Sequence, residues 1–215
     1  MTVEAKICGL TRPRDAALAA ELGAWRLGVI FAGGPRIIAA SVAAEIVRAA
    51  GDVPVLGVFG SQSLETILAM LDHAGLSGAQ LHGSSDDATA AAIRARGFEV
   101  WRVIALDDGV ELGPALAAHS SSADALLVEA RTVDRQGGKG IALPLDVARK
   151  ARLAAPAIPF VLAGGLTDET VTAAIRAVDP DAVDVSSGVE QSMGIKDHAR
   201  LARFLENVFA ARSAA

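Results

Sequence analysis

Short apolar runs of β-type composition alternate along the chain with alanine-rich segments whose apolar positions recur at helical spacing. A run of about five apolar residues bounded by glycine or polar residues favours a buried strand, whereas apolar positions at i, i+3 and i+4 favour an amphipathic helix. The expected strands are Glu4–Cys8, Arg26–Phe31, Val53–Phe59, Gly78–His82, Glu99–Ala105, Ala123–Ala130, Pro159–Ala163 and Ala182–Ser186. The expected helices are Arg14–Leu22, Val42–Ala50, Leu64–His73, Ala88–Arg96, Leu145–Leu153, Glu169–Val178 and His198–Ala211, with a weaker helix over Pro114–His119.

This alternation points to parallel βαβ units of roughly 27 residues each. About eight such units fit into 215 residues, near the short end of the length range of a (β/α)8 TIM barrel. No shift in composition and no Pro/Ser-rich linker divides the chain. The sequence therefore predicts an α/β protein in which residues 1–215 form a single (β/α)8-barrel domain, with Thr167 and Asp197 capping the helices that follow them.

Composition and charge exclude several classes of function. The net charge is −5, no basic block stands out, and aromatic residues make up 4% without any tyrosine, so we expect no nucleic-acid partner. No signal peptide and no uninterrupted apolar stretch of about 18 residues is evident, so no membrane segment is expected. A single cysteine excludes an internal disulfide and is typical of a reducing compartment, which predicts a cytoplasmic protein. The four histidines lack metal-ligand spacing, and we expect neither a metal nor a cofactor.

Cys8, the only cysteine, stands where the first expected strand runs into a glycine turn. Side chains at the carboxyl ends of parallel strands face the ligand site of an α/β barrel, which makes this thiol a candidate nucleophile or proton-transfer group. Free cysteine is also among the most buried residue types, so a small buried apolar side chain is the alternative. Position alone leaves both interpretations open.

Two glycine turns follow the last two expected strands, with Gly164 and Gly165 after the first and Ser186, Ser187 and Gly188 after the second. Barrels often bind phosphate with these two loops, because glycine lets backbone N–H groups approach an anion and serine adds hydroxyl donors. Either turn alone is explained by tight geometry, but the two together favour a phosphorylated ligand.

A third glycine cluster over residues 137–140, containing Gly138 and Lys139, follows the sixth expected strand. It is either a cover that brings the Lys139 charge to a phosphate or a solvated loop.

Longer motifs follow one another along nearly the whole chain. They are Lys-Ile-Cys-Gly-Leu-Thr at 6–11, Gly-Val-Ile-Phe at 28–31 with Pro-Arg at 35–36, Leu-Gly-Val-Phe at 56–59, Gln-Leu-His-Gly at 80–83, Leu-Ala-Gly-Gly-Leu at 162–166, and Asp-Val-Ser-Ser-Gly-Val-Glu at 184–190 with Gly-Ile-Lys-Asp at 194–197. In order and spacing this set resembles the phosphoribosylanthranilate isomerase family of tryptophan biosynthesis.

The resemblance implies a cofactor-independent Amadori rearrangement of N-(5′-phosphoribosyl)anthranilate to 1-(2-carboxyphenylamino)-1-deoxyribulose 5-phosphate. In that family a carboxylic acid protonates the ribose ring oxygen and the strand-one cysteine removes the C2′ proton. Carried over, Cys8 is the general base, and Glu129, at the family's aspartate position, is the general acid. The base then needs a pKa below the free value of about 8.5, and the acid needs burial or a negative neighbour to remain protonated.

The same resemblance assigns Arg36 to the anthranilate carboxylate, which suits the donor fork of a guanidinium. His82 and Asp184 are expected to orient neighbouring groups. The chain departs from the family pattern at Glu129, whose extra methylene moves the carboxyl by roughly 1 Å. It also departs at Gly34, which replaces a serine, and in the Gly-Gly-Lys-Gly loop.

Two other functions stay open. One is a related Amadori isomerase acting on a histidine-pathway ribonucleotide, although such barrels use paired aspartates and twin phosphate sites that this chain lacks. The other is a paralogue that binds a sugar phosphate without converting it, which the substitutions on the sixth strand suggest. The expected ligand is a small phosphorylated anthranilate compound, and the sequence is compatible with a monomer or a homodimer.

Overall fold

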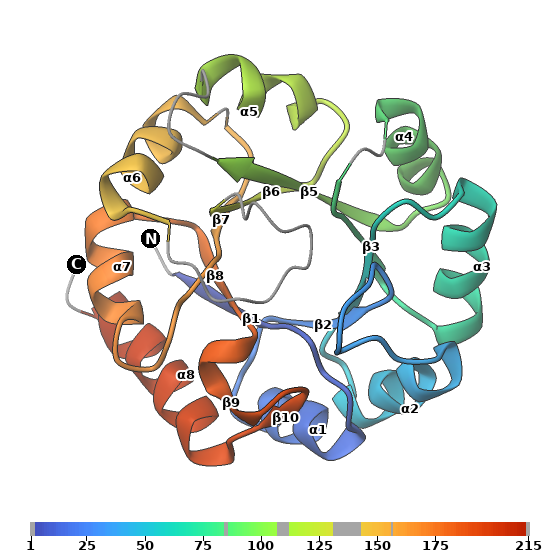
Figure 1. Ribbon diagram of the computed structural model, residues 1–215, viewed down its shortest axis with the longest axis horizontal. Coiled ribbons are helices and arrows are strands. Elements are labelled where there is room, and N and C mark those ends of the chain that lie inside the picture. The colour runs from blue at the N-terminus through green and yellow to red at the C-terminus, as the bar shows by residue number, and fades with distance from the viewer. Residues whose placement is uncertain (1–2, 84–85, 107–111, 131–142, 156, 214–215) are drawn as a thin grey trace.

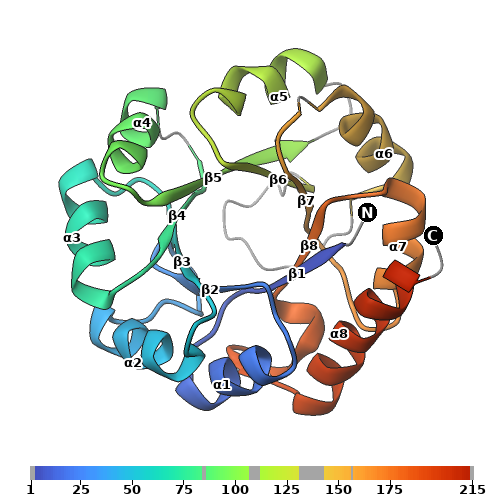
Figure 2. The ribbon, with the colours of Figure 1, turned by 180° about the vertical axis from the view of Figure 1, so that it is seen from behind.

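The computed structural model describes residues 3–83, 86–106, 112–130, 143–155 and 157–213. Eight parallel strands close into a barrel in the order β1 to β8, and helices surround it (Figures 1 and 2). This confirms the predicted (β/α)8 barrel. The strands are β1 (Glu4–Ile7), β2 (Arg26–Ile30), β3 (Val55–Phe59), β4 (Gly78–Leu81), β5 (Glu99–Leu106), β6 (Ala125–Ala130), β7 (Phe160–Leu162) and β8 (Ala182–Val185).

Each expected helix is present, with ends that differ by a few residues. The helices are α1 (Pro13–Glu21), α2 (Ala40–Ala50), α3 (Leu64–Ala74), α4 (Asp87–Ala95), α5 (Leu112–Ser120), α6 (Leu145–Ala154), α7 (Val171–Val178) and α8 (His198–Ser213). Asp197 caps α8 as predicted, since its Oδ1 accepts hydrogen bonds of 3.0 Å from the N–H groups of Ala199 and Arg200. Thr167 instead closes a turn before α7, where its hydroxyl accepts a hydrogen bond from the N–H of Thr170.

The sequence did not predict a short insertion after β8. A 3₁₀ turn, η1 (Ser187–Val189), leads into a two-stranded antiparallel hairpin of β9 (Glu190–Ser192) and β10 (Ile195–Lys196). Figure 1 shows this hairpin beside α1 and α8. Strands of two or three residues are too short to show an alternation of apolar and polar positions, so the sequence pattern does not predict them.

Alternation along the strands divides the apolar residues into two cores. The larger core lies between the barrel and the helices and includes Ile7, Phe59 and Phe204. The smaller one fills the barrel and consists of Leu56, Trp101, Ala125, Leu127, Val161, Ala163 and Ala182. The barrel is therefore packed, and inward-facing polar side chains lie at the carboxyl ends of several strands.

No helix in the described part of the chain combines the length and the apolarity needed to cross a bilayer.

Candidate active site

The barrel mouth is lined by polar side chains from four strands. Lys6 and Cys8 lie two residues apart along β1 and its end, and Asp184 is paired in register with Lys6 on β8. His82 directly follows β4, and Glu129 lies near the end of β6. Because side chains alternate between the two faces of a strand, all of these groups point into the barrel at its carboxyl end.

Lys6 forms a buried ion pair beside the cysteine. Its side chain has no exposed surface, and its Nζ lies 2.6 Å from Asp184 Oδ1. A Cβ atom added to Gly28 would lie 2.8 Å from Cys8 Sγ and 3.1 Å from Lys6 Nζ. The thiol and the ammonium therefore share the space above Gly28, and only glycine on β2 leaves room for both.

Burial sets the resting state of Cys8. Loss of solvent raises the pKa of the thiol above its usual value, although the neighbouring Lys6 charge acts in the opposite direction. The pKa of this thiol is therefore not lowered as the general-base role requires, because desolvation outweighs the ammonium. Burial also disfavours the charged form of Lys6, but Asp184 and Cys8 together raise the pKa of Lys6 and keep it an ammonium.

Glu129 is held by a histidine. Its Oε1 lies 2.7 Å from His82 Nε2, and the two side chains remain 29% and 39% exposed. The hydrogen bond and the charge of Glu129 raise the pKa of His82 despite its partial burial. The described surroundings of Glu129 thus supply an imidazole in place of the expected negative neighbour.

Arg36 is buried in a second charged cluster. Its Nε and Nη2 each donate a hydrogen bond of 2.7 Å to Glu190, the first residue of β9. Lys196 Nζ lies 3.2 Å from Glu190 and donates to the backbone carbonyls of Cys8 at 2.7 Å and Ser186 at 2.9 Å. This cluster therefore connects the ends of β1 and β8 to the hairpin, and it carries one more positive than negative charge.

The two predicted glycine turns meet each other. A Cβ atom on Gly188 would lie 1.8 Å from the carbonyl oxygen of Leu166, so the loops after β7 and β8 touch backbone to backbone. Gly164 and Gly165 have φ values of 92° and 67°, which glycine adopts without strain. Ser187 begins η1, and the Ser186 Oγ is buried without a hydrogen-bond partner among the described residues. Gln80 Oε1, on the inward face of β4, is buried in the same unpartnered state.

Gly138 and Lys139 lie outside the described residues.

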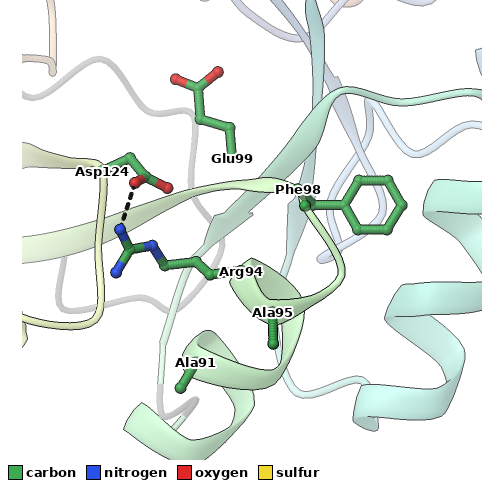
Figure 3. A pocket seen from close by; sticks show the side chains of 7 residues that line it. Ala91, Arg94, Ala95, Phe98, Glu99 and Asp124 are labelled. Atoms are coloured by element: carbon green, nitrogen blue, oxygen red, sulfur yellow. Dashed lines mark hydrogen bonds and ion pairs between the residues drawn. The ribbon is translucent and has the colours of Figure 1, made fainter.

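A separate groove of about 640 Å³ lies between the end of α4 and the amino ends of β5 and β6 (Figure 3). Its main polar groups, Arg94 and Asp124, form an ion pair of 2.9 Å with each other. This groove is at the end of the barrel opposite to the mouth, where residues of (β/α)8 barrels serve stability rather than chemistry. The described residues include no group of three His, Cys, Asp or Glu side chains placed to hold a metal ion.

The sequence identified the reactive groups of the site but not the charged residues that pair with them. It identified Cys8, Glu129 and Arg36 but assigned no role to Lys6, Glu190 or Lys196. Each of these is fully or almost fully buried. A charged residue inside a short apolar run is the signal that could have found Lys6, since an unpaired buried lysine is rare.

The family model of N-(5′-phosphoribosyl)anthranilate (PRA) isomerase matches residues 5–207. The chain is 37% identical over 209 residues to N-(5′-phosphoribosyl)anthranilate isomerase of Desulfatibacillum aliphaticivorans, covering 96% of this chain and 93% of the relative. Among solved structures, phosphoribosyl anthranilate isomerase from Thermus thermophilus has a TM-score of 0.86 at 32% identity, covering 98% of this chain and 100% of that one. An isomerase in complex with reduced 1-(o-carboxyphenylamino)-1-deoxyribulose 5-phosphate has a TM-score of 0.82 at 30% identity, covering 96% and 98%. The chain therefore belongs to the N-(5′-phosphoribosyl)anthranilate isomerase family.

Proposed function

We propose that this protein catalyses the Amadori rearrangement of N-(5′-phosphoribosyl)anthranilate to 1-(2-carboxyphenylamino)-1-deoxyribulose 5-phosphate, the isomerase step of tryptophan biosynthesis. The observation that carries the proposal is the thiol of Cys8 at the mouth of the barrel, with the Lys6 ammonium beside it over Gly28. A cationic neighbour is what a cysteine needs to form a thiolate. The ligand of the related solved complex is a reduced form of the same product.

The reaction divides between two groups. Glu129 delivers a proton to the ribose ring oxygen, the C1′–O bond breaks, and the anthranilate nitrogen lone pair forms a C1′=N iminium. The Cys8 thiolate then removes the C2′ proton, and the electron pair of that bond forms the enol. Conversion of the enol to the ketone moves one proton from the C2′ oxygen to C1′. Strands β6 and β1 are separated by β7 and β8 in the closed barrel, so the acid and the base approach the ribose from different sides.

The ends of the substrate fit the two remaining features. The phosphate is placed at the loops that meet at Gly188, where the Ser186 hydroxyl is available as a donor. The anthranilate carboxylate is placed at Arg36, whose Nη1 has no hydrogen-bond partner within the described part of the chain. Glu190 holds the guanidinium by its other edge, so the free edge is oriented before substrate arrives.

The test is a fluorescence assay in which phosphoribosylanthranilate is generated in situ and its consumption is followed. Wild type is compared with Cys8→Ala, Glu129→Gln and the exposed control Glu65→Gln, each checked for folding by circular dichroism. General acid and base groups contribute about 10² to 10⁴-fold each, so both site variants should lose activity on that scale and the control should not. Glu129→Asp, which restores the family's residue, keeps a carboxyl group and should retain more activity than Glu129→Gln.

Each alternative has its own signature in this experiment. Activity that survives Glu129→Gln would assign the acid to another residue. A folded wild type that binds the reduced product analogue without turnover would be the binding paralogue. Absence of both binding and turnover would overturn the proposed function.

A further inference from the structure

The carboxyl group proposed as the acid has an environment unlike that of a lone protonated glutamate. Glu129 is 29% exposed in its side chain, so desolvation is limited, and its near neighbour is His82 at 2.7 Å. A carboxyl group in hydrogen-bond contact with an imidazole shares its proton with that ring, so the two act as one group. The proton needed for ring opening must then be held in another way.

The order of the strands explains why His82 and Glu129 contact each other. Strand β5 lies between β4 and β6, and its inward residues beyond Trp101 are Val103 and Ala105. These aliphatic side chains allow His82 and Glu129 to meet across β5. The other inward-facing charged or titratable groups that the structure describes are Lys6, Cys8 and Asp184 on the opposite wall, and Glu4 with the Arg26–Glu99 ion pair at the amino end of the barrel. Glu129 is the charge that acts on the pKa of His82.

Resting on the proposed function, we infer that His82 and Glu129 hold one proton between them and that this pair is the general acid. Glu129 is the member that touches the ribose ring oxygen, and His82 is a positioning residue that supplies the proton through it. The resting pair is imidazolium and carboxylate. When the proton passes through Glu129 to the ring oxygen, the pair is left as neutral imidazole and carboxylate.

Protons balance over the cycle. The pair gives one proton to the ring oxygen, and Cys8 accepts one from C2′. After the product forms, the Cys8 thiol releases a proton to solvent and the pair takes one up. The extra methylene of Glu129, relative to the aspartate of the family pattern, thereby has a function, because it carries the carboxyl toward His82.

The pH dependence of kcat/KM distinguishes the pair from a lone carboxyl. The reactive form needs the protonated pair and the Cys8 thiolate at once, so the rate follows the product of these two fractions. If the pair loses its proton at a lower pH than Cys8, the rate rises with pH up to the pKa of the pair. It then stays level and falls above the pKa of Cys8. The acid limb therefore reports the pair.

We would record this profile for wild type, His82→Gln and Glu129→Asp. Glutamine keeps a hydrogen-bond donor but cannot be protonated, and aspartate is too short to keep the 2.7 Å contact. Both variants should shift the acid limb downward toward an ordinary carboxyl value. The level region should fall by up to tenfold for each pH unit of that shift. The double variant should show no further shift, because both changes break the same contact. The exposed His73→Gln variant, on α3, should match wild type.

A second readout does not depend on turnover. Titration of the His82 imidazole by NMR should give a pKa above the usual 6.5 in wild type and a lower one in Glu129→Gln. An imidazole pKa that does not respond to Glu129→Gln, or an acid limb unmoved in both His82→Gln and Glu129→Asp, would overturn the inference. An inactive wild type with the expected imidazole titration would instead contradict the proposed function and leave the pair intact.

Discussion

Replacement of Glu190 by glutamine should cost the protein a large part of its stability. Glu190 is 7% exposed, accepts two hydrogen bonds of 2.7 Å from Arg36, and lies 3.2 Å from Lys196 Nζ. Glutamine has nearly the same shape, but it removes the negative charge and turns an N–H₂ group toward a guanidinium donor. Two buried cations then face each other without an anion between them.

The magnitude follows from the burial of the cluster. Removing one partner of a buried ion pair costs about 3–5 kcal/mol, mostly because the remaining charge has lost its counterion. For a domain of this length each kcal/mol lowers Tm by roughly 2–4 °C, so the expected drop is roughly 6–20 °C. The loss should also reach the mouth of the barrel, because Lys196 holds the carbonyls of Cys8 and Ser186.

The pH dependence adds a sharper check. Burial favours the protonated form of Glu190, but the Arg36 hydrogen bonds and the Lys196 charge outweigh it and lower its pKa below 4.5. The folded pKa is then below the unfolded one, so the stabilisation is fully present above the unfolded value and is lost as the pH falls through the folded value. The gap between wild type and Glu190→Gln should therefore be constant from pH 6 to 8 and should close at acid pH.

Urea denaturation at several pH values, followed by circular dichroism, measures this gap. Glu206→Gln, at an exposed position on α8, is the matched control and should stay within about 0.5 kcal/mol of wild type. A loss at pH 7 below about 1 kcal/mol, or a gap that persists unchanged at pH 3.5, would refute the argument.

Three further outcomes are expected. Lys6→Met leaves the Asp184 carboxylate, whose side chain is only 11% exposed, without its cation and should cost up to about 3–5 kcal/mol in urea denaturation. Adding Asp184→Asn should recover stability but not kcat/KM, and a fully active double variant would contradict the role of Lys6. Gly188→Ala places a methyl group against the Leu166 carbonyl and should raise KM for the phosphorylated substrate and cost about 1–3 kcal/mol. Gly113→Ala, which meets open space, is its control, and equal KM values would argue against the phosphate loops. In wild type, the level region of the kcat/KM profile should extend to the pKa of Cys8, and kcat/KM should fall only above pH 9.0, because burial raises that pKa beyond this value. A decline that begins below pH 8 would show that Cys8 ionises more readily than its burial implies.

The sequence determined the architecture because the relevant signals are local. A buried strand or an amphipathic helix shows its period within a window of about ten residues, and this sufficed to place each barrel strand to within about two residues of its observed ends. The reactive positions were also accessible. Cys8 and Glu129 end or nearly end apolar runs, and the carboxyl ends of barrel strands carry the chemistry. The β9–β10 hairpin was too short to leave such a period.

The electrostatic partners were decided only by the tertiary structure. Lys6 meets Asp184 across 178 positions of sequence, Arg36 meets Glu190 across 154, and His82 meets Glu129 across 47. Which charges meet depends on how the strands are staggered when the barrel closes and on which side chains between them are small. A short stretch of sequence predicts neither the stagger nor these neighbours. For the same reason the sequence could not show whether Cys8 meets the pKa requirement of a general base, because the desolvation that raises its pKa exists only once the barrel has closed around the thiol.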